Sequence, residues 1–141
     1  MAQVRRIFVE KKPGFDVEAR GLLLDLRENV GLKGLAQVRM INRYDVGGLD
    51  EAESVLVRNT VFAEPPADMV FEETIELEKE SRVFAMEYLP GQYDQRADWA
   101  AQCIQVVTQK DRPQVTSAKL VVLYGEISNE QYETVKSYCI N

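Results

Sequence analysis

A Pro-Gly turn occurs twice in this chain of 141 residues, each time between a strand-like run and a helix-like run. The first turn spans Pro13–Asp16 and the second spans Pro90–Asp94. The preceding runs align as well, because Ile7–Glu10 lies over Phe84–Glu87 at an offset of 77 residues (84 − 7 = 77). Such a repeat predicts one folding unit present twice, since a solenoid needs about three or more shorter repeats to bury its faces.

The alignment continues beyond the turns at drifting offsets. Ala19 lies over Ala97 at an offset of 78 (97 − 19 = 78), and Tyr44 lies over Tyr124 at an offset of 80 (124 − 44 = 80). Small loop insertions between equivalent elements would produce this drift. We therefore expect a pseudo-twofold internal duplication.

Apolar periodicity predicts the same order of elements in both repeats. The expected strands cover 4–11, 35–46, 71–77, 83–89 and 115–124, and the strand at 71–77 is expected at a sheet edge. The expected helices run from 17 to 30, from 51 to about 62, from 97 to about 108, and from 129 onward. Asp16 and Asp94 are predicted to cap the helices that follow them, because an aspartate carboxylate accepts hydrogen bonds from first-turn amides. The pairs Asp50–Glu53 and Ser128–Gln131 have the spacing of capping boxes.

The chain divides into a first repeat at residues 1–77 and a second repeat at 78–141. Between Glu64 and Glu80, seven acidic residues stand against one lysine, which predicts a solvated connector beginning at about residue 64. The counterpart of the strand at 71–77 would begin near position 149 (71 + 78 = 149). We therefore expect the second repeat to be truncated and the chain to be an N-terminal piece of a longer protein.

Composition argues against several classes of function. The chain has no histidine, which removes the commonest general base and metal ligand. Its net charge of −6 opposes a nucleic-acid binder, since neutralising phosphates requires lysine and arginine. The sequence contains no apolar run of about 18 residues, so no membrane span is expected. Two cysteines and no secretory leader favour a cytoplasmic protein. We expect no catalytic, cofactor-binding or metal-binding residue in the chain.

Two pairs of carboxylates are candidate chemical sites. Asp94 and Asp98 lie one helical turn apart and could share a magnesium ion, but a helix cap beside a surface carboxylate is the favoured interpretation. Glu10 and Glu87 hold equivalent strand positions and could share a proton, but pairing of each with lysine or arginine on the solvent side is favoured.

The second turn is richer in aromatic residues than a plain turn requires. Tyr88, Tyr93, Trp99 and Tyr124 surround it, which suggests a ligand floor or a docking surface. Core packing is nevertheless the default expectation for Trp99 and Tyr124. For the run from Tyr88 to Arg96, binding of a partner and formation of a simple turn are about equally supported.

Essentially all 141 residues resemble the N-terminal domain of large, single-chain phosphoribosylformylglycinamidine synthases. The resembling stretches are VRRIFVEKKPGFDVEARGLL, INRYDV, TVFAEPP and EYLPGQYDQRADWAAQCIQ. The resemblance implies an α+β fold with two ferredoxin-like, PurS-like halves, antiparallel sheets and helices packed on one face. It also implies that the two halves pair about a pseudo-twofold axis.

The resemblance implies an architectural function in purine biosynthesis. The parent enzyme is a ligase that amidates formylglycinamide ribonucleotide with ATP, magnesium and ammonia from glutamine, and its catalytic motifs lie in other domains. This segment is expected to dock on the synthetase and glutaminase domains of the same polypeptide and to support ammonia transfer. The expected contact residues lie in the two turns: Pro13, Gly14, Asp16, Tyr88, Pro90, Gly91, Gln92, Tyr93, Asp94, Gln95 and Arg96. The fragment itself is expected to be a monomer or a weak homodimer.

Two other functions stay open. A tandem ACT-like regulatory module would use the same strand, turn and helix, with glycine letting the backbone approach a small metabolite between the two halves. An RNA-binding ferredoxin-like sheet would need a basic face with stacking aromatics. The negative charge of both halves, −4 for residues 1–77 and −2 for residues 78–141, makes the RNA-binding alternative remote.

Overall fold

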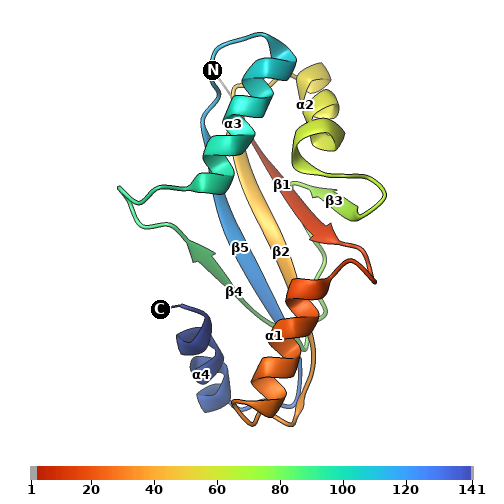
Figure 1. The fold of residues 1–141 in the computed structure, drawn as a ribbon, viewed down its shortest axis with the longest axis vertical. Helices are drawn as coiled ribbons and strands as arrows, with labels where there is room; N and C mark the ends of the chain where they lie inside the picture. The colour runs from red at the N-terminus through yellow and green to blue at the C-terminus, as the bar shows by residue number, and fades with distance from the viewer. Residues whose placement is uncertain (1–2, 141) are drawn as a thin grey trace.

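Within residues 3–140, one antiparallel sheet of five strands organises the fold, and four α-helices pack against it (Figure 1). The computed structural model describes residues 3–140. The strands occur in the spatial order β3-β1-β2-β5-β4. Their bounds are β1 Val4–Lys11, β2 Leu35–Gly47, β3 Asp68–Glu72, β4 Arg82–Glu87 and β5 Val115–Gly125. The helices are α1 Val17–Glu28, α2 Glu51–Val57, α3 Gln95–Thr108 and α4 Asn129–Cys139, and a π-helical turn η1, Arg58–Phe62, extends α2.

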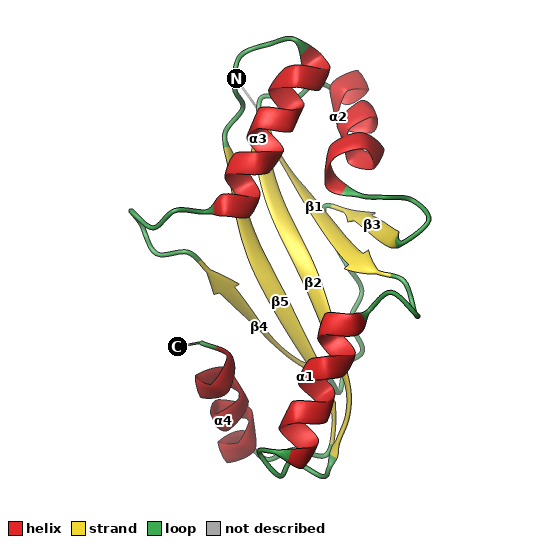
Figure 2. Cartoon of the chain, in the orientation of Figure 1, coloured by secondary structure: helices red, strands yellow, loops and turns green. Residues whose placement is uncertain are grey.

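All four helices cover the same face of the sheet (Figure 2). α2 and α3 lie over one end of the strands, and α1 and α4 lie over the other end (Figure 1). Alternation along β1 points Ile7 and Val9 toward the helices and Phe8 toward the opposite, helix-free face. The predicted α+β class, antiparallel pairing and one-sided helix packing are therefore confirmed. None of the helices within residues 3–140 is both long enough and apolar enough to span a membrane.

The two halves of the chain share one sheet, because their long strands β2 and β5 pair at its centre. The register places Met40 opposite Val121 and Ile41 opposite Leu120. Helix α3 packs against α2 and η1 from the other half of the chain, with Val57, Ala100 and Ile104 in one buried cluster. Folding either half alone would leave these surfaces without their cover.

Local sequence signals set most of the element boundaries. The strands predicted at 4–11, 35–46 and 115–124 agree with β1, β2 and β5 within one residue. Both capping boxes are present: Glu53 N donates to Asp50 Oδ1 at 2.8 Å, and Gln131 N donates to Ser128 Oγ at 3.1 Å. The strand predicted at 83–89 ends earlier, at Glu87.

The acidic connector is not simply solvated, and the strand predicted at 71–77 is wrong in its bounds. β3 occupies Asp68–Glu72 at the predicted sheet edge, and Glu73 then adopts a left-handed backbone with φ 65°. Because β3 and β4 form opposite edges, residues 73–81 must cross the sheet to join them. Ile75 and Leu77 pack on the helix-free face against a cluster that includes Phe8. The alternation of apolar residues in this segment therefore reflects packing of their side chains against a face of the sheet. It does not reflect strand pairing within the sheet.

Two sequence-based expectations fail in detail. The Asp16 carboxylate does not cap α1, because Asp16 Oδ1 accepts from Gly14 N at 3.1 Å and from Arg20 Nε at 3.0 Å instead. The offset of 80 does not relate equivalent strand positions either. Tyr44 packs toward the helices, whereas Tyr124 packs on the helix-free face. A one-residue slip reverses the face of every strand residue, so positions of β2 and β5 that are 80 residues apart face opposite sides of the sheet.

Candidate functional site

The second Pro-Gly loop projects from one edge of the sheet, between β4 and α3 (Figure 1). Gln92 N donates to Leu89 O at 2.9 Å, and Leu89 N donates to Gln92 Oε1 at 2.7 Å, so the turn closes on itself. Gly91 has φ 87°, a backbone that disfavours other residues. All the predicted contact residues of this loop are exposed except Asp94 and Arg96, which are half-buried.

Asp94 fixes the loop to both the helix and the sheet. Asp94 Oδ1 accepts from Ala97 N at 2.9 Å, which is the predicted helix cap. Asp94 Oδ2 accepts from Ser117 N at 2.9 Å, and Ser117 Oγ lies 2.7 Å from Asp94 Oδ1. The carboxylate therefore satisfies an amide of β5 beyond the point where β4 ends its pairing.

We expect Asp94→Ala to lower the free energy of unfolding by about 2 kcal/mol, since it removes a helix cap and leaves a strand amide unpaired. Asp16→Ala is the matched control at the first turn, where the carboxylate caps no helix amide. Urea denaturation followed by circular dichroism measures both variants. Equal losses for the two variants would contradict the assigned role of Asp94.

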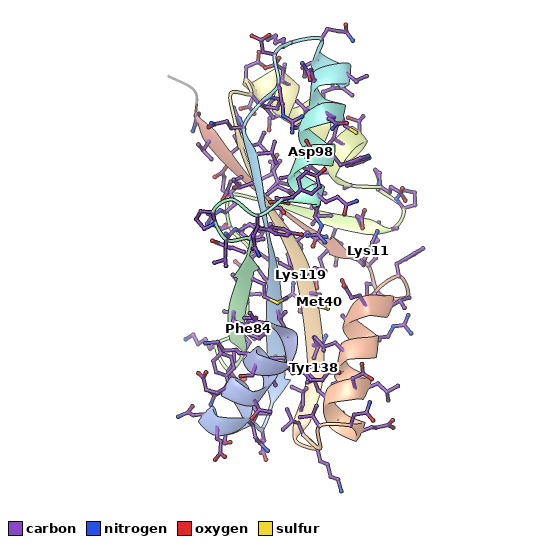
Figure 3. All side chains as sticks on the ribbon, turned by 60° about the vertical axis from the view of Figure 1, so that its left-hand side comes forward. Lys11, Met40, Phe84, Asp98, Lys119 and Tyr138 are labelled. Carbon is purple, nitrogen blue, oxygen red and sulfur yellow. The ribbon has the colours of Figure 1, made fainter. Side chains whose placement is uncertain are left out.

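Asp98, on α3 (Figure 3), is the centre of a polar network beside the loop. Its Oδ2 accepts from Tyr93 Oη at 2.5 Å and from Gln102 Nε2 at 3.2 Å, and its Oδ1 pairs with Arg112. The Tyr93 hydrogen bond, followed by Arg112, lowers the pKa of the Asp98 carboxyl. With Asp94 engaged separately, the described residues show no cluster of carboxylates that could hold a metal ion.

Tyr93→Phe should move the pKa of Asp98 upward, toward its ordinary value, because it removes the largest stabilising contact of the carboxylate. A carboxyl whose folded-state pKa is depressed stabilises the fold above its unfolded pKa, and the contribution disappears as pH falls through the folded pKa. An NMR titration of the Asp98 side-chain carbon measures the shift. An unchanged pKa in Tyr93→Phe would contradict this network.

Exposed apolar side chains surround the second loop. Leu89 is 67% exposed, Tyr93 is 68% exposed and Trp99 is 57% exposed. Core packing of Trp99 was therefore the wrong expectation, whereas Tyr124 does pack, against the helix-free face and away from the loop. Trp99 and Val106 fall outside the buried stripe of α3, and the helical period of that stripe was the signal that could have identified them.

The first loop lies at the other side of the sheet, so the structure does not bring the two loops together (Figure 1). Phe15 N donates to Lys12 O at 2.9 Å, and Lys12 N donates to Ala67 O at 2.8 Å. Pro13 and Gly14 are exposed and Asp16 is half-buried. This loop offers one exposed aromatic ring, that of Phe15.

Each loop forms the wall of a groove where a long strand extends beyond its shorter neighbour. Groove 1, about 610 Å³, is lined by the first loop, the first turn of α1 and residues 37–40 of β2, beyond the last β1 pair, Glu10 with Ile41. Groove 2, about 670 Å³, is lined by the second loop, the first turns of α3 and the start of β5, beyond the last β4 pair, Glu87 with Ala118.

Glu10 and Glu87 each pair with their own arginine on the helix-free face. This is the pairing that the sequence favoured over a shared proton. Arg39 holds Glu10 through two hydrogen bonds of 2.6 and 2.8 Å and also donates to Tyr124 Oη at 3.1 Å. Arg43 Nη2 lies 2.5 Å from Glu87 Oε1. Glu10 is buried, contrary to its expected solvent-side position, and its hydrogen bond raises the pKa of Arg39 further above its ordinary value.

Comparisons of this chain with protein-family models, with curated proteins and with solved structures found no match.

Proposed function

We propose that this chain is a non-catalytic N-terminal domain of a large, single-chain phosphoribosylformylglycinamidine synthase. In this proposal it is cytoplasmic and docks on the synthetase and glutaminase domains of the same polypeptide. ATP and magnesium would bind in those other domains. The chain would help to keep ammonia away from bulk water as it passes between them, which preserves the reactive neutral form.

The observation that carries the proposal is the correspondence between the two halves. Ile7 and Phe84 are buried strand residues at an offset of 77, and Leu26 and Ile104 are buried helix residues at an offset of 78. The capping boxes at Asp50 and Ser128 are also 78 residues apart. Grooves 1 and 2 are built by corresponding elements. These correspondences support two PurS-like, ferredoxin-like halves paired about a pseudo-twofold axis.

The second loop is the proposed docking element. Tyr93 and Leu89 are more than half exposed, and Trp99, on the solvent side of α3, is more than half exposed as well. Protein interfaces are enriched in tyrosine, tryptophan and arginine, and Arg96 lies in the first turn of α3, directly after this loop. The hydrogen bonds of Asp94 hold the loop in place before docking, which lowers the entropic cost of forming the interface.

The test compares glutamine-dependent with ammonia-dependent synthesis in the full-length enzyme. Tyr93→Ala combined with Arg96→Ala should lower the glutamine-dependent rate by about 10-fold, equivalent to about 1.4 kcal/mol, and spare the ammonia-dependent rate. Tyr138→Ala, at a tyrosine of α4 that is 44% exposed, is the matched control. Unchanged rates with both nitrogen sources would refute a role of the loop in ammonia transfer.

A further inference from the structure

Strand β4 pairs with β5 in the same register in which β1 pairs with β2. Ile7 pairs with Tyr44, and Phe84 pairs with Val121, so one offset relates both members of the pair (84 − 7 = 77, 121 − 44 = 77). On its other side β1 pairs with β3, whereas β4 ends the sheet and has no further strand within residues 3–140. The outer edge of β4 therefore corresponds to an edge of β1 that already holds a strand.

The hydrogen bonds between β1 and β3 identify the backbone groups of β4 that point outward. Glu73 N donates to Arg6 O at 2.8 Å, so Arg6 and every second residue after it in β1 face β3. The offset of 77 residues places Val83, Ala85 and Glu87 in the corresponding positions of β4. The amide and carbonyl groups of these three residues therefore face away from β5.

Side chains already occupy the two ends of this edge. Tyr132 Oη donates to Val83 O at 2.9 Å, and Gln92 Oε1 accepts from Leu89 N at 2.7 Å. Among the described residues, the outward backbone groups at positions 85 and 87 have no hydrogen-bond partner. The middle of the edge is therefore open to a strand from another polypeptide.

The side chains beside this open edge are less covered than those of β1. Phe8 and Val9 are each 6% exposed, and β3 lies next to both. At the positions 77 residues later, Ala85 is exposed and Met86 is half-buried. Val83 is 41% exposed on the same face as Ala85. An added strand would cover apolar surface on both faces of the sheet, as β3 does beside β1.

Helix α4 lies beside β4 as α2 lies beside β1. Arg5 Nε donates to Leu49 O, just before α2, at 3.3 Å. Arg82 Nη2 donates to Ile127 O, just before α4, at 3.3 Å. Figure 1 shows α4 next to the start of β4. A strand added to β4 would therefore lie next to α4, in the position that β3 has next to α2 and η1.

α4 also supplies a positive charge at this edge. In the first half, Arg58 Nη1 forms an ion pair of 3.0 Å with Glu72 of β3. The residue of α4 that lies 78 positions after Arg58 is Lys136, whose side chain is 37% exposed. Lys136 Nζ lies 5.4 Å from the centre of the Tyr132 ring, and the hydroxyl of that ring reaches β4. An acidic side chain placed as Glu72 is placed would meet Lys136.

We propose that the outer edge of β4 binds an extended segment of a partner polypeptide as a sixth, antiparallel strand. By correspondence with β3, this segment has an apolar residue opposite Met86, a large apolar residue opposite Ala85 and an acidic residue opposite Phe84. The first packs beneath α4, the second covers the helix-free face, and the third pairs with Lys136. Backbone hydrogen bonds provide the affinity and the side chains provide the specificity.

A second copy of β4 does not have this chemistry. In a twofold antiparallel pair, residues that face each other lie on the same face of the sheet, so only even-numbered positions can lie opposite Phe84. None of the even-numbered residues in or next to β4 is acidic: Arg82, Phe84, Met86 and Tyr88. Strand addition also does not depend on docking of the second loop, so the two proposals can fail separately.

The test is an NMR titration of the ¹⁵N-labelled 141-residue chain with the peptide acetyl-ADMVFEE-amide, the sequence of residues 67–73. The amides of residues 83–87 should show saturable shifts, and hydrogen exchange at Ala85 and Glu87 should slow. The absence of saturable shifts in β4 would overturn the proposal. Shifts confined to β1 and β2 would also overturn it, because the peptide would then have replaced β3.

Two N-methylated peptides separate strand pairing from nonspecific apolar contact. The peptide phenylalanine corresponds to Phe71, whose amide faces β1, and the valine corresponds to Val70, whose amide faces away. N-methylation at the phenylalanine should abolish binding, whereas N-methylation at the valine should preserve it. Equal affinities of the two methylated peptides would contradict pairing along the edge of β4.

A charge reversal tests the position of the acidic residue. Lys136→Glu should weaken peptide binding by about 5-fold, and a peptide with lysine in place of its first glutamate should regain the loss. Lys33→Glu, at an exposed position in the loop before β2, is the matched control and should leave the affinity unchanged. Equal affinities of Lys136→Glu and Lys33→Glu would overturn the assigned register.

Sedimentation equilibrium of the chain without peptide tests the other occupant. Ala85→Pro blocks the outer edge and spares the pairing with β5, because the amide of Ala85 points outward. The chain should not self-associate through this edge, and Ala85→Pro should lose peptide binding. A dimer that disappears in Ala85→Pro would assign the edge to a second copy and overturn the proposal. If Ala85→Pro does not fold, the methylated peptides decide the outcome.

Discussion

Replacing Gly125 by alanine should lower the free energy of unfolding by about 2–5 kcal/mol, because two separate costs add. Gly125 has φ 126°, where a side chain is strained. A Cβ atom there would lie 2.3 Å from Gly34 O and 2.6 Å from Ala36 N. Both contacts are with backbone atoms at the end of the central β2–β5 pair, so the strands themselves would have to separate.

Two other glycines separate these costs. Gly14→Ala, at φ 94° with no atom within 4 Å of the added Cβ, should show the backbone strain alone, about 1–2 kcal/mol. Gly21→Ala, in the exposed interior of α1 with free space around it, should stabilise the chain by up to about 1 kcal/mol. Urea unfolding curves measure all three. A Gly125→Ala loss no larger than that of Gly14→Ala would contradict the close approach of the strands.

Replacing Arg39 by methionine should cost about 3 kcal/mol, because it leaves the Glu10 carboxylate buried without its cation. Glu10 is 8% exposed, so water cannot readily replace the two hydrogen bonds from the guanidinium. The double variant Glu10→Leu with Arg39→Met should regain most of this loss, since a pair of apolar side chains leaves no buried charge.

The four forms of this double-mutant cycle give the coupling energy between Glu10 and Arg39 directly. Arg20→Met is the control at an exposed ion pair, with Asp16, and should cost less than about 0.5 kcal/mol. Guanidinium chloride is avoided as the denaturant because its ions screen charge, and urea is used instead. A double variant as unstable as Arg39→Met alone would show that packing of the long arginine side chain, and not charge, holds this face.

The parts of the fold that the sequence predicted correctly depend on residues close together in the chain. The capping boxes at Asp50 and Ser128 join residues three positions apart, and β1 follows from alternation within eight residues. The turn at Gly91 and the edge position of β3 also followed from local patterns. These signals are reliable because they act over a short range. A first-turn amide finds its side-chain partner within one turn of the helix, and a turn glycine is required by the backbone conformation at its own position.

The failed cap at Asp16 is local, since its carboxylate binds Gly14 and Arg20, but most other features that the sequence did not predict join distant residues. Asp94 binds Ser117, 23 positions away, and Gly125 approaches Gly34 across the central strand pair. The same acidic connector that looked solvated crosses the sheet because β3 and β4 lie at opposite edges. For the candidate sites, the sequence identified the second loop and, through the helical period of α3, carried a signal for the exposure of Trp99, but it gave no indication that groove 1 exists.

The sequence by itself determined where most strands, helices, caps and turns form, and its repeated Pro-Gly turn led to the expectation of two similar units. Only the tertiary structure decided that the two halves of the chain share one sheet, that helices pack across the halves, and that each turn borders a groove. Those outcomes depend on strand order and register, which arise from burial of side chains far apart in the chain. A shift of one residue in register reverses every side chain of a strand, so a repeat read at offset 80 could not reveal which face Tyr44 or Tyr124 occupies.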